Sequence, residues 1–328
     1  MKIRTKKLML IPVLCASLLC GGCEVAGRKV IFTTGIGNKD VFRIGETVCT
    51  LPEAKVYLCN YQNIYGSVYG LNLWEQASSK KQLDSYVKEM TISELARITC
   101  MDQLAEEQDI SLSEEEQRKA AEAAKAYFSS LSKDEIAYMD VTEETIETLY
   151  QNYALADKLY ATLTEGVNEE VSDDEARIIH AMQIVVKDKE NADAVTARLA
   201  AGEDFTSLAS DYNDGQDIEV TFGRGDVPEE VEKVAFSMED GEVSPCIETD
   251  QGYYFIKCVN KYDEELTQEN KVKIAQEREK TAFNDAYDAF VKEQDSMLNE
   301  KLWDETKIVT DGSITTNSFF AVYAQYCK

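Results

Sequence analysis

Residues 176–214 read ARIIHAMQIVVKDKENADAVTARLAAGEDFTSLASDYND, and residues 219–261 read EVTFGRGDVPEEVEKVAFSMEDGEVSPCIETDQGYYFIKCVNK. The first apolar run predicts a strand, because its side chains alternate between two largely apolar faces. One face carries Ile178, His180, Met182, Ile184 and Val186, and the other carries Ile179, Ala181, Gln183 and Val185. A strand that is apolar on both sides is typical of a central strand covered by helices.

The rest of this block alternates short helical and strand-like runs. Gly202 is expected to end a helix over residues 189–200, and the turn Asp250-Gln251-Gly252 predicts a hairpin. An acidic link over residues 169–174 precedes the block. We therefore predict a separate domain over residues 174–262.

Helices dominate on both sides of this block. After a strand near residues 41–44, Thr50 and Glu53 form a capping-box pattern that predicts the start of a helix. The further helices expected before the block cover residues 80–107, 114–131 and 142–164.

A long polar helix is expected from Thr267 to near Trp303. Its apolar face consists of Phe283, Tyr287, Phe290, Met297 and Leu298. A lone helix of this kind must bury that face, and the N-terminal helical region is the simplest partner. The predicted class is therefore α+β: an α-helical domain built from both chain ends, with an inserted domain made of a small antiparallel sheet flanked by helices. The predicted parts around the insertion are an N-terminal helical region over residues 41–170, a C-terminal helix over 263–308 and a tail over 309–328. The structure of the tail stays open, with an added edge strand as one interpretation.

Four tyrosines, Tyr57, Tyr61, Tyr65 and Tyr69, recur at four-residue spacing. This spacing places their rings along one slowly winding stripe of a helix. Two interpretations stay open: the rings pack into the core, or they form an aromatic surface that holds unfolded segments.

The first residues have the order of a secretory signal, with four basic residues ahead of an apolar run from Leu8 to Cys20. A spanning helix needs about 20 apolar residues, so this run is too short for a permanent anchor. The sequence Leu19-Cys20-Gly21-Gly22-Cys23 resembles a bacterial lipobox, with cysteine at position 20 where leucine is expected. We predict a signal peptide over residues 1–22 and a tether over 23–40 that carries a lipid on Cys23; secretion without a lipid is the alternative.

The composition limits the partners of the chain. It has 34 basic and 61 acidic residues, a formal net charge of −27, which argues against nucleic acid as a partner because phosphate would be repelled. Anionic lipid headgroups would be repelled as well, so membrane contact is expected only through the lipid anchor. No cofactor is predicted, and no metal site, because a chain with one histidine cannot form a multi-histidine site. No specific disulfide is predicted, because the cysteines beyond the lipobox lack CxxC spacing; they are Cys49, Cys59, Cys100, Cys246, Cys258 and Cys327.

Five features of the block resemble the parvulin family of peptidyl-prolyl isomerases. They are the first strand running into VVKD, the AGEDF step between two helices, the FGRG loop, the AFSMEDGEVSP segment and the TDQGYYFIK hairpin. With a lipobox in front and helices on both sides, the whole chain resembles the PrsA foldase lipoproteins and, more distantly, the SurA-type periplasmic chaperones. The resemblance implies a parvulin-like fold for the block, a chaperone role for the helical domain, and unfolded or nascent exported polypeptides as partners.

The resemblance also implies site residues, since parvulins surround the bound proline with two histidines, a cysteine or aspartate, and methionine and phenylalanine side chains. Gln183 and Tyr254 fall at the two histidine positions, so both family histidines are replaced. The cysteine-or-aspartate position falls at Gly215 or, with a one-residue shift, at Asp214. The implied substrate-binding positions are Phe222, Val227, Val231 and Thr249; the two valines replace the methionine and the phenylalanine.

His180, the only histidine, lies three residues before Gln183, so in a regular strand it points to the opposite face. A satisfied buried histidine is the favoured interpretation, and a catalytic role would require a bulge. Gln183 and Tyr254 are able to hydrogen-bond to each other or to Thr249. Such a network would either orient a substrate carbonyl or only stabilise the sheet.

Together these features predict a foldase on the outer face of the bacterial cytoplasmic membrane, with peptidyl-prolyl isomerase activity of the parvulin type. No nucleophile is obligatory, because an apolar pocket that holds the proline ring and reduces amide resonance is enough to accelerate rotation. The alternative is a non-catalytic chaperone that uses the parvulin-like domain as a peptide-binding module. A third class, a solute-binding or hydrolytic lipoprotein, would require a cleft with a coherent polar set, which the sequence does not show.

Overall fold

The computed structural model describes residues 36–68, 71–75, 77–167, 170–215 and 217–328. It divides the chain into two compact units. The helical unit comprises the described residues up to Leu163 together with Phe283–Lys328, and the sheet unit comprises Thr164–Ala282. The signal segment, Cys23 and Tyr69 lie outside the described residues, so what was predicted for them stays a prediction.

The helical unit contains a small sheet. Strands β1 (Asp40–Ile44) and β2 (Thr47–Thr50) are antiparallel neighbours. Strand β9 (Ser296–Leu298) pairs with the other edge of β1 and places Leu298 opposite Phe42. Backbone pairing therefore joins segments from both ends of the chain in one three-stranded sheet.

Capping boxes start several helices of this unit. At the start of α1 (Leu51–Tyr65), the N–H of Thr50 donates to the Glu53 carboxylate over 2.6 Å, which confirms the predicted start. Helix α4 (Lys133–Met139), which was not predicted, has the same capping box at Ser132 and Glu135. The remaining elements of this unit are β3 (Ser67–Val68), β4 (Leu71–Asn72), the 3-10 helix η1 (Leu73–Glu75), α2 (Ala77–Glu107), α3 (Glu114–Ser130), α5 (Glu143–Thr164), α11 (Glu300–Glu305) and α12 (Phe319–Cys327).

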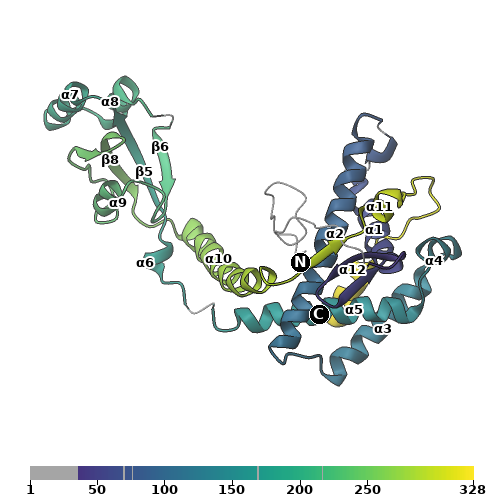
Figure 1. Cartoon of the computed structure of the whole chain (residues 1–328). Helices are drawn as coiled ribbons and strands as arrows, with labels where there is room; N and C mark the ends of the chain where they lie inside the picture. The colour runs from purple at the N-terminus through teal and green to yellow at the C-terminus, as the bar shows by residue number, and fades with distance from the viewer. Residues whose placement is uncertain (1–35, 69–70, 76, 168–169, 216) are drawn as a thin grey trace, which may run out of the picture. The chain divides into compact units, whose positions relative to one another are not determined.

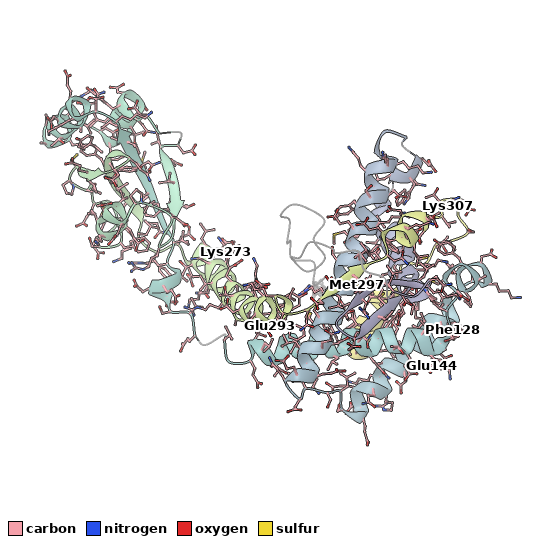
Figure 2. The ribbon with its side chains drawn as sticks, viewed as in Figure 1. Phe128, Glu144, Lys273, Glu293, Met297 and Lys307 are labelled. Carbon is pink, nitrogen blue, oxygen red and sulfur yellow. The ribbon has the colours of Figure 1, made fainter. Side chains whose placement is uncertain are left out.

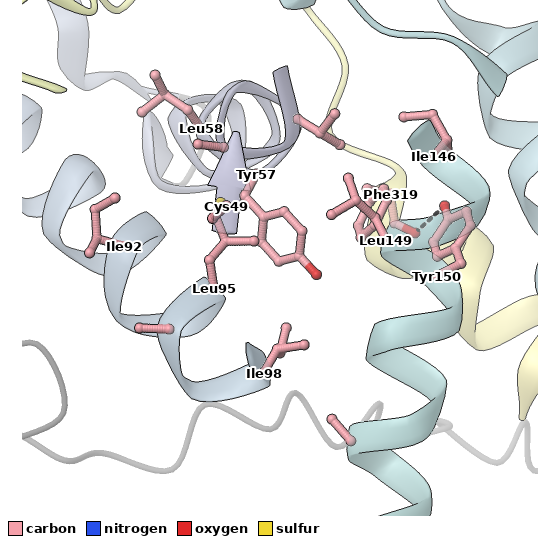
Figure 3. Packing of buried hydrophobic residues seen from close by; sticks show 14 of the residues in the cluster. Cys49, Tyr57, Leu58, Ile92, Leu95, Ile98, Ile146, Leu149, Tyr150 and Phe319 are labelled. Atoms are coloured by element: carbon pink, nitrogen blue, oxygen red, sulfur yellow. Dashed lines mark hydrogen bonds between the residues drawn. The ribbon is translucent and has the colours of Figure 1, made fainter. Parts of the chain in front are cut away.

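One core fills the helical unit, and the tyrosine stripe of α1 is part of it. Tyr57 and Tyr61 are 0% and 4% exposed. Figure 3 shows Tyr57 between Leu95 of α2 and Leu149 of α5, with Phe319 of α12 nearby. Core packing is therefore the correct interpretation of the described part of the stripe, and a segment near the end of the chain covers it.

The long helix α10 (Glu264–Val291) contributes residues to both units. It begins earlier than the predicted Thr267, because the Asp263 carboxylate caps it by accepting the N–H of Leu266 over 3.0 Å. The Thr267 hydroxyl instead accepts the N–H of Ile178 over 3.1 Å inside the sheet unit.

The predicted end of this helix near Trp303 was wrong. The helix stops at Val291, and Met297 and Leu298, which were assigned to its apolar face, lie in β9. Figure 2 marks Met297 in this strand and Glu293 in the turn before it. The physical reason is the free edge of β1, which accepts a third strand only if the helix ends.

The edge strand considered for residues 309–328 was also wrong. The segment ends in helix α12, which packs against α3. Phe319 and Tyr323, four residues apart and therefore on one side of the helix, are both buried in the core.

The sheet unit is built on four antiparallel strands in the order β6-β5-β8-β7 (Figure 1). The predicted first strand, the helix over residues 189–200 and the hairpin are confirmed. The elements are α6 (Asp173–Ala176), β5 (Ile179–Val186), α7 (Lys189–Ala200), α8 (Phe205–Tyr212), β6 (Glu219–Phe222), α9 (Glu229–Ala235), β7 (Ile247–Thr249) and β8 (Gly252–Asn260).

Gly252 fixes the hairpin between β7 and β8. Its φ is +134°, and a Cβ there would lie 2.7 Å from the carbonyl oxygen of Val186. Only glycine allows β8 to approach the end of β5 this closely.

The sheet separates two apolar clusters, which define its two faces. The α9 face holds Ile179, Ala181, Phe222, Val231, Ala235, Phe236, Met238, Ile247, Ile256 and Cys258. The α7–α8 face holds Ile184, Val186, Ala192, Val195, Phe205, Leu208, Ala209 and Phe255. The protein is therefore α+β, with each face of the central sheet buried by its own helices. Within the described ranges, no helix is long and apolar enough to cross a membrane.

Candidate functional site

The register of the sheet brings Gln183 and Tyr254, the two predicted polar site residues, onto the α9 face. Val185 of β5 lies opposite Tyr254 of β8, and Gln183 lies opposite Ile256. Gln183 shares the face of Ile179 and Ala181 by strand alternation, and Tyr254 packs against the same cluster. Gln183 and Tyr254 are therefore diagonal neighbours, a relation that spans roughly 7–8 Å in antiparallel sheets.

Thr249 reaches the same face from the neighbouring strand. It lies opposite Gly252, and Ile247, two residues before it, lies opposite Tyr254. Its hydroxyl donates to the Gly252 carbonyl over 2.9 Å. The hydroxyl thus closes the hairpin at the edge of the candidate site.

An apolar wall stands beside these polar groups. Phe222, at the end of β6, lies opposite Ile179 and is 5% exposed. Val231 of α9 is 1% exposed, and Val227, in the loop before α9, is half-buried against the same cluster. The three predicted apolar substrate-binding positions therefore meet on one face.

Two arginines pack against the ring of Phe236, which neighbours Phe222 in this apolar wall. The guanidinium carbons of Arg177 and Arg224 lie 4.8 Å and 4.5 Å from the centre of the Phe236 ring. Arg177 also donates to the Phe236 carbonyl over 2.8 Å. The Phe236 ring in turn lies 6.2 Å from that of Phe222.

The FGRG loop is fixed by carboxylates. The Gly223 N–H donates to Asp226 over 2.9 Å, and the Gly225 N–H donates to Glu232 over 2.8 Å. Gly225 has a φ of +84°, which favours glycine. These bonds set the position at which Val227 and α9 begin.

The expected hydrogen bonds among Gln183, Tyr254 and Thr249 are not those that form. The Gln183 side-chain amide donates to the Asp217 carbonyl over 3.0 Å, and the Tyr254 hydroxyl lies 3.4 Å from the Gln251 side-chain oxygen. The reason is that the loop before β6 lies directly beside β5 and offers a nearer acceptor than the neighbouring strand.

The same loop positions Asp214. Its N–H donates to the Val185 carbonyl over 2.7 Å, and its carboxylate accepts the N–H of Lys187 over 3.3 Å. Asn213 accepts the N–H of Val185 over 2.9 Å. Asp214 therefore lies at the end of β5 beside Val185, whose other neighbour is Tyr254.

His180 lies on the face opposite Gln183, as strand alternation predicts. The pairing of β5 with β8 is irregular between His180 and Ala181, but the extra residue is Val259 on β8, so β5 itself keeps its alternation. His180 is half-buried rather than fully buried.

Five buried residues of the α9 face were not predicted to be part of the site. Phe236, Met238 and Ile247 belong to the α9 face, and so do Ile256 and Cys258. The alternation of Tyr254, Ile256 and Cys258 along β8 is the sequence feature that could have identified the last two. Burial raises the pKa of the Cys258 thiol and Asp240 adds to this effect, so the thiol stays protonated near neutral pH.

Taken together, the α9 face offers an apolar wall, an amide, two hydroxyls and no metal: among the described residues no group of three or more His, Cys, Asp or Glu side chains is placed to bind an ion. Such a surface can hold an apolar ring and donate a hydrogen bond to a neighbouring carbonyl. Among the six side chains of this face that were predicted as site residues, no nucleophile lies beside a base.

Comparisons with known proteins show what this chain is similar to. Residues 141–274 match the family described as the PPIC-type PPIase domain. The chain is 27% identical over 240 residues to the foldase protein PrsA of Caldanaerobacter subterraneus subsp. tengcongensis, a match that covers 65% of this chain and 73% of that protein. It is 26% identical over 306 residues to the foldase protein PrsA of Clostridium acetobutylicum, with 84% and 88% covered. A crystal structure of the peptidylprolyl isomerase PrsA from Bacillus cereus superimposes with a TM-score of 0.35 at 21% identity, covering 80% of this chain and 99% of that one.

The sheet unit is a parvulin domain of the PPIC type. The chain as a whole is similar to the foldase proteins named PrsA, and in sequence its parvulin domain lies between the two parts of the helical unit.

Proposed function

We propose that this chain is a foldase anchored by a lipid on Cys23 at the outer face of a bacterial cytoplasmic membrane, and that its parvulin domain is a peptidyl-prolyl isomerase for unfolded exported polypeptides. The observation that carries the isomerase proposal is the convergence of Phe222, Val231, Gln183 and Tyr254 on the α9 face. The similarity to proteins named foldase supports it.

Rotation about a prolyl peptide bond is accelerated by an apolar pocket that binds the ring and a hydrogen bond that reduces amide resonance. The barrier to rotation about a peptide bond is about 18–20 kcal/mol, and each reduction of roughly 1.4 kcal/mol increases the rate tenfold. The proline ring would lie against Phe222 and Val231. The Tyr254 hydroxyl, whose bond to Gln251 is long at 3.4 Å, is the group most easily released to donate to the substrate.

A pair of matched variants tests this proposal. Phe222→Ala removes the wall of the α9 face, whereas Phe205→Ala removes a ring of the same size, 3% exposed, from the opposite face. Each should cost the sheet unit about 3–5 kcal/mol of stability. The rate of cis-trans exchange in a short prolyl peptide, corrected for the folded fraction, should fall by about tenfold or more in Phe222→Ala only, because about 1.4 kcal/mol of ring contact is lost. Equal losses in the two variants would contradict the placement of the site.

The second candidate function is a chaperone without catalysis. The observation that favours it is that Gln183, Tyr254 and Thr249 all have hydrogen-bond partners within the sheet unit. A substrate would have to displace these partners before the groups could act. Suppression of client aggregation together with an uncatalysed rate of prolyl exchange would select this function.

The anchor is tested separately. Cys23→Ser removes the lipid acceptor, and the negative net charge of −27 gives the protein no other attraction to an anionic membrane. We expect the variant in the medium and the unchanged chain in the membrane fraction. Retention of Cys23→Ser in membranes would overturn the proposed anchor.

A further inference from the structure

The two arginines that pack on the Phe236 ring share one carboxylate of α6. Nη2 of Arg224 donates to Oδ2 of Asp174 over 2.7 Å, and its Nε donates to the Asp174 carbonyl over 3.0 Å. Nη2 of Arg177 lies 3.3 Å from Oδ1 of the same carboxylate. Asp174 therefore holds both of the cations that contact this ring.

Arg224 also joins α6 to α9. Its Nη1 donates to Oε1 of Glu232 over 3.3 Å, and Oε2 of Glu232 accepts the Gly225 N–H over 2.8 Å. Glu232 directly follows Val231, which is buried in the apolar wall. The planar guanidinium thus contacts a carboxylate of α6, a carboxylate of α9 and an aromatic ring at once, a combination that the compact ammonium of lysine does not reproduce.

Helix α6 is itself fixed by α10. Nζ of Lys271 lies 2.5 Å from Oδ1 of Asp173, and Nδ2 of Asn270 donates to the Ala176 carbonyl over 2.9 Å (Figure 1). A helix of four residues is too short to be stable by itself. The position of Asp174 therefore depends on the docking of α6 against α10.

One N–H group of this cluster has no partner. Nε of Arg177 is buried and makes no hydrogen bond to any described residue. An unsatisfied buried donor is unfavourable, so stability alone does not explain an arginine here. Arg177 instead holds Phe236 at two points, by the contact with its ring and by a 2.8 Å bond to its carbonyl.

The Phe236 ring connects the arginines to the candidate prolyl site. It is 8% exposed, and its centre lies 6.2 Å from that of Phe222, the ring proposed to hold the proline. Protein interiors are close-packed and transmit small displacements. A shift of Phe236 would therefore move Phe222 as well.

We propose that Arg224 and Asp174 are positioning residues of the proposed prolyl site. Asp174, held by α10, fixes the Arg224 guanidinium. Arg224 in turn fixes Phe236 on one side and, through Glu232, the start of α9 on the other. Neither Arg224 nor Asp174 touches the substrate. This proposal rests on the proposed isomerase function and adds a connection from the prolyl site to α10.

This role has a specific kinetic consequence. The contact of the proline ring with Phe222 and Val231 is made alike before and during rotation, so a loosened wall weakens both states equally. Loss of Arg224 should therefore raise KM and leave kcat nearly unchanged. A residue that only stabilised the fold would lower the folded fraction, and with it the apparent kcat, without moving KM.

The test compares Arg224→Gln with Arg198→Gln in the full chain. Arg198 of α7 is the matched control, because it pairs with two carboxylates, Glu203 and Asp211, and its guanidinium lies over the Tyr212 ring. Its side chain is 35% exposed, against 36% for that of Arg224. Both substitutions remove exposed ion pairs, so they should lower stability slightly and to a similar extent.

Prolyl exchange is measured over a range of concentrations of an uncharged proline-containing peptide, with thermal unfolding as the check on folding. We expect Arg224→Gln to raise KM by about fivefold or more with kcat within about twofold, and Arg198→Gln to change neither. Asp174→Ala should raise KM in the same direction. Adding it to Arg224→Gln should raise KM little further, because the two side chains act as one unit.

Three results would overturn the positioning role while leaving the isomerase proposal untouched. They are an unchanged KM in folded Arg224→Gln, a fall in kcat alone, and an equal rise of KM in Arg198→Gln. If Arg224→Gln does not fold, Asp174→Ala decides by the same criteria.

A failure of the proposed function would look different. If the unchanged chain does not catalyse exchange, catalysis fails as a function, and the dissociation constant of the same peptide replaces KM, followed through the amide resonances of β6 and α9. The same pattern among the variants is then expected, and an equal affinity in all of them overturns the positioning role. An unchanged chain that neither catalyses nor binds overturns both proposals.

Discussion

The two units of this protein position their important residues by different means. In the sheet unit, strand register brings Gln183, Tyr254 and Thr249 to one face, and their polar groups bind loops and turns rather than each other. In the helical unit, single buried side chains such as Glu135 and Asn60 each fix the path of a distant segment. The difference teaches that polar substitutions should be mild in the sheet unit and severe in the helical unit, while ring deletions should be severe in both.

Ring deletions should have the largest effects. Phe319 and Phe255 are 0% and 1% exposed, in the helical and the sheet unit respectively. Phe319→Ala and Phe255→Ala should each lower the free energy of unfolding of their own unit by about 3–5 kcal/mol. Hydrogen exchange resolved by unit measures both. A cost below about 1 kcal/mol for Phe319→Ala would mean that α12 is not part of the core.

The next largest effect on stability is expected for one of two matched carboxylates in the helical unit. Glu135 and Glu116 occupy the same capping-box position in α4 and α3, but only Glu135 also accepts the N–H groups of a distant segment, those of Thr315 and the buried Thr316. Glu135→Ala leaves those donors unsatisfied and should cost about 3 kcal/mol or more. Glu116→Ala loses a surface cap and a solvent-exposed ion pair with Lys158, and should cost about 1 kcal/mol. Urea unfolding of both variants checks the difference, and equal costs would contradict the role of Glu135.

The pH dependence of stability follows from the same carboxylate. Burial alone would raise the pKa of Glu135, but the N–H groups of Ser132, Thr315 and Thr316 outweigh it and hold that pKa below its usual value. This contribution to stability is therefore present above the unfolded pKa of about 4.3 and is lost as the pH falls below it. Glu135→Gln should be less stable at pH 7 and should lose less on acidification, as measured by urea unfolding at pH 7 and pH 3.5. A parallel loss in both proteins would refute the assignment.

Polar changes on the α9 face should have the smallest effects on stability. Gln183→Ala loses one bond, to the Asp217 carbonyl, and should cost about 1 kcal/mol. Tyr254→Phe loses a long, exposed contact with Gln251 and should cost less than about 0.5 kcal/mol. Thermal unfolding measures both. A loss of several kcal/mol of stability in either variant would show that these polar groups mainly stabilise the fold.

More of the sheet unit than of the helical unit could be predicted from the sequence. Alternation identified β5, Gly202 ended α7, and Gly252 marked the hairpin, because each depends on local chemistry. The parvulin resemblance then placed Phe222 and Val231 on what proved to be one face.

The errors came from long-range partners. Met297 continues a helical pattern, and only the distant edge of β1 explains why it lies in a strand. The path of residues 308–327 depends on side chains about 180 to 260 positions away, such as Glu135 and Asn60. The hydrogen bonds of Gln183 and Tyr254 likewise depend on how loops close, which alternation does not determine.

The most direct test of the central claim, that the α9 face is the prolyl site in parvulin register, is a gain of activity. Gln183→His combined with Tyr254→His puts two histidines, at the positions where the parvulin resemblance predicts them, as diagonal neighbours on this face. The control, Met182→His combined with Tyr253→His, puts two histidines from the same strands on the α7–α8 face.

Prolyl exchange in a short peptide is measured for both variants and the unchanged chain, with circular dichroism as the check on folding. We expect the rate of the first variant to exceed that of the unchanged chain by about tenfold or more, a fraction of what one preorganised hydrogen-bond donor contributes in other enzymes, and the rate of the control not to exceed it. A folded first variant with an unchanged or lower rate would show that the α9 face is not the prolyl site.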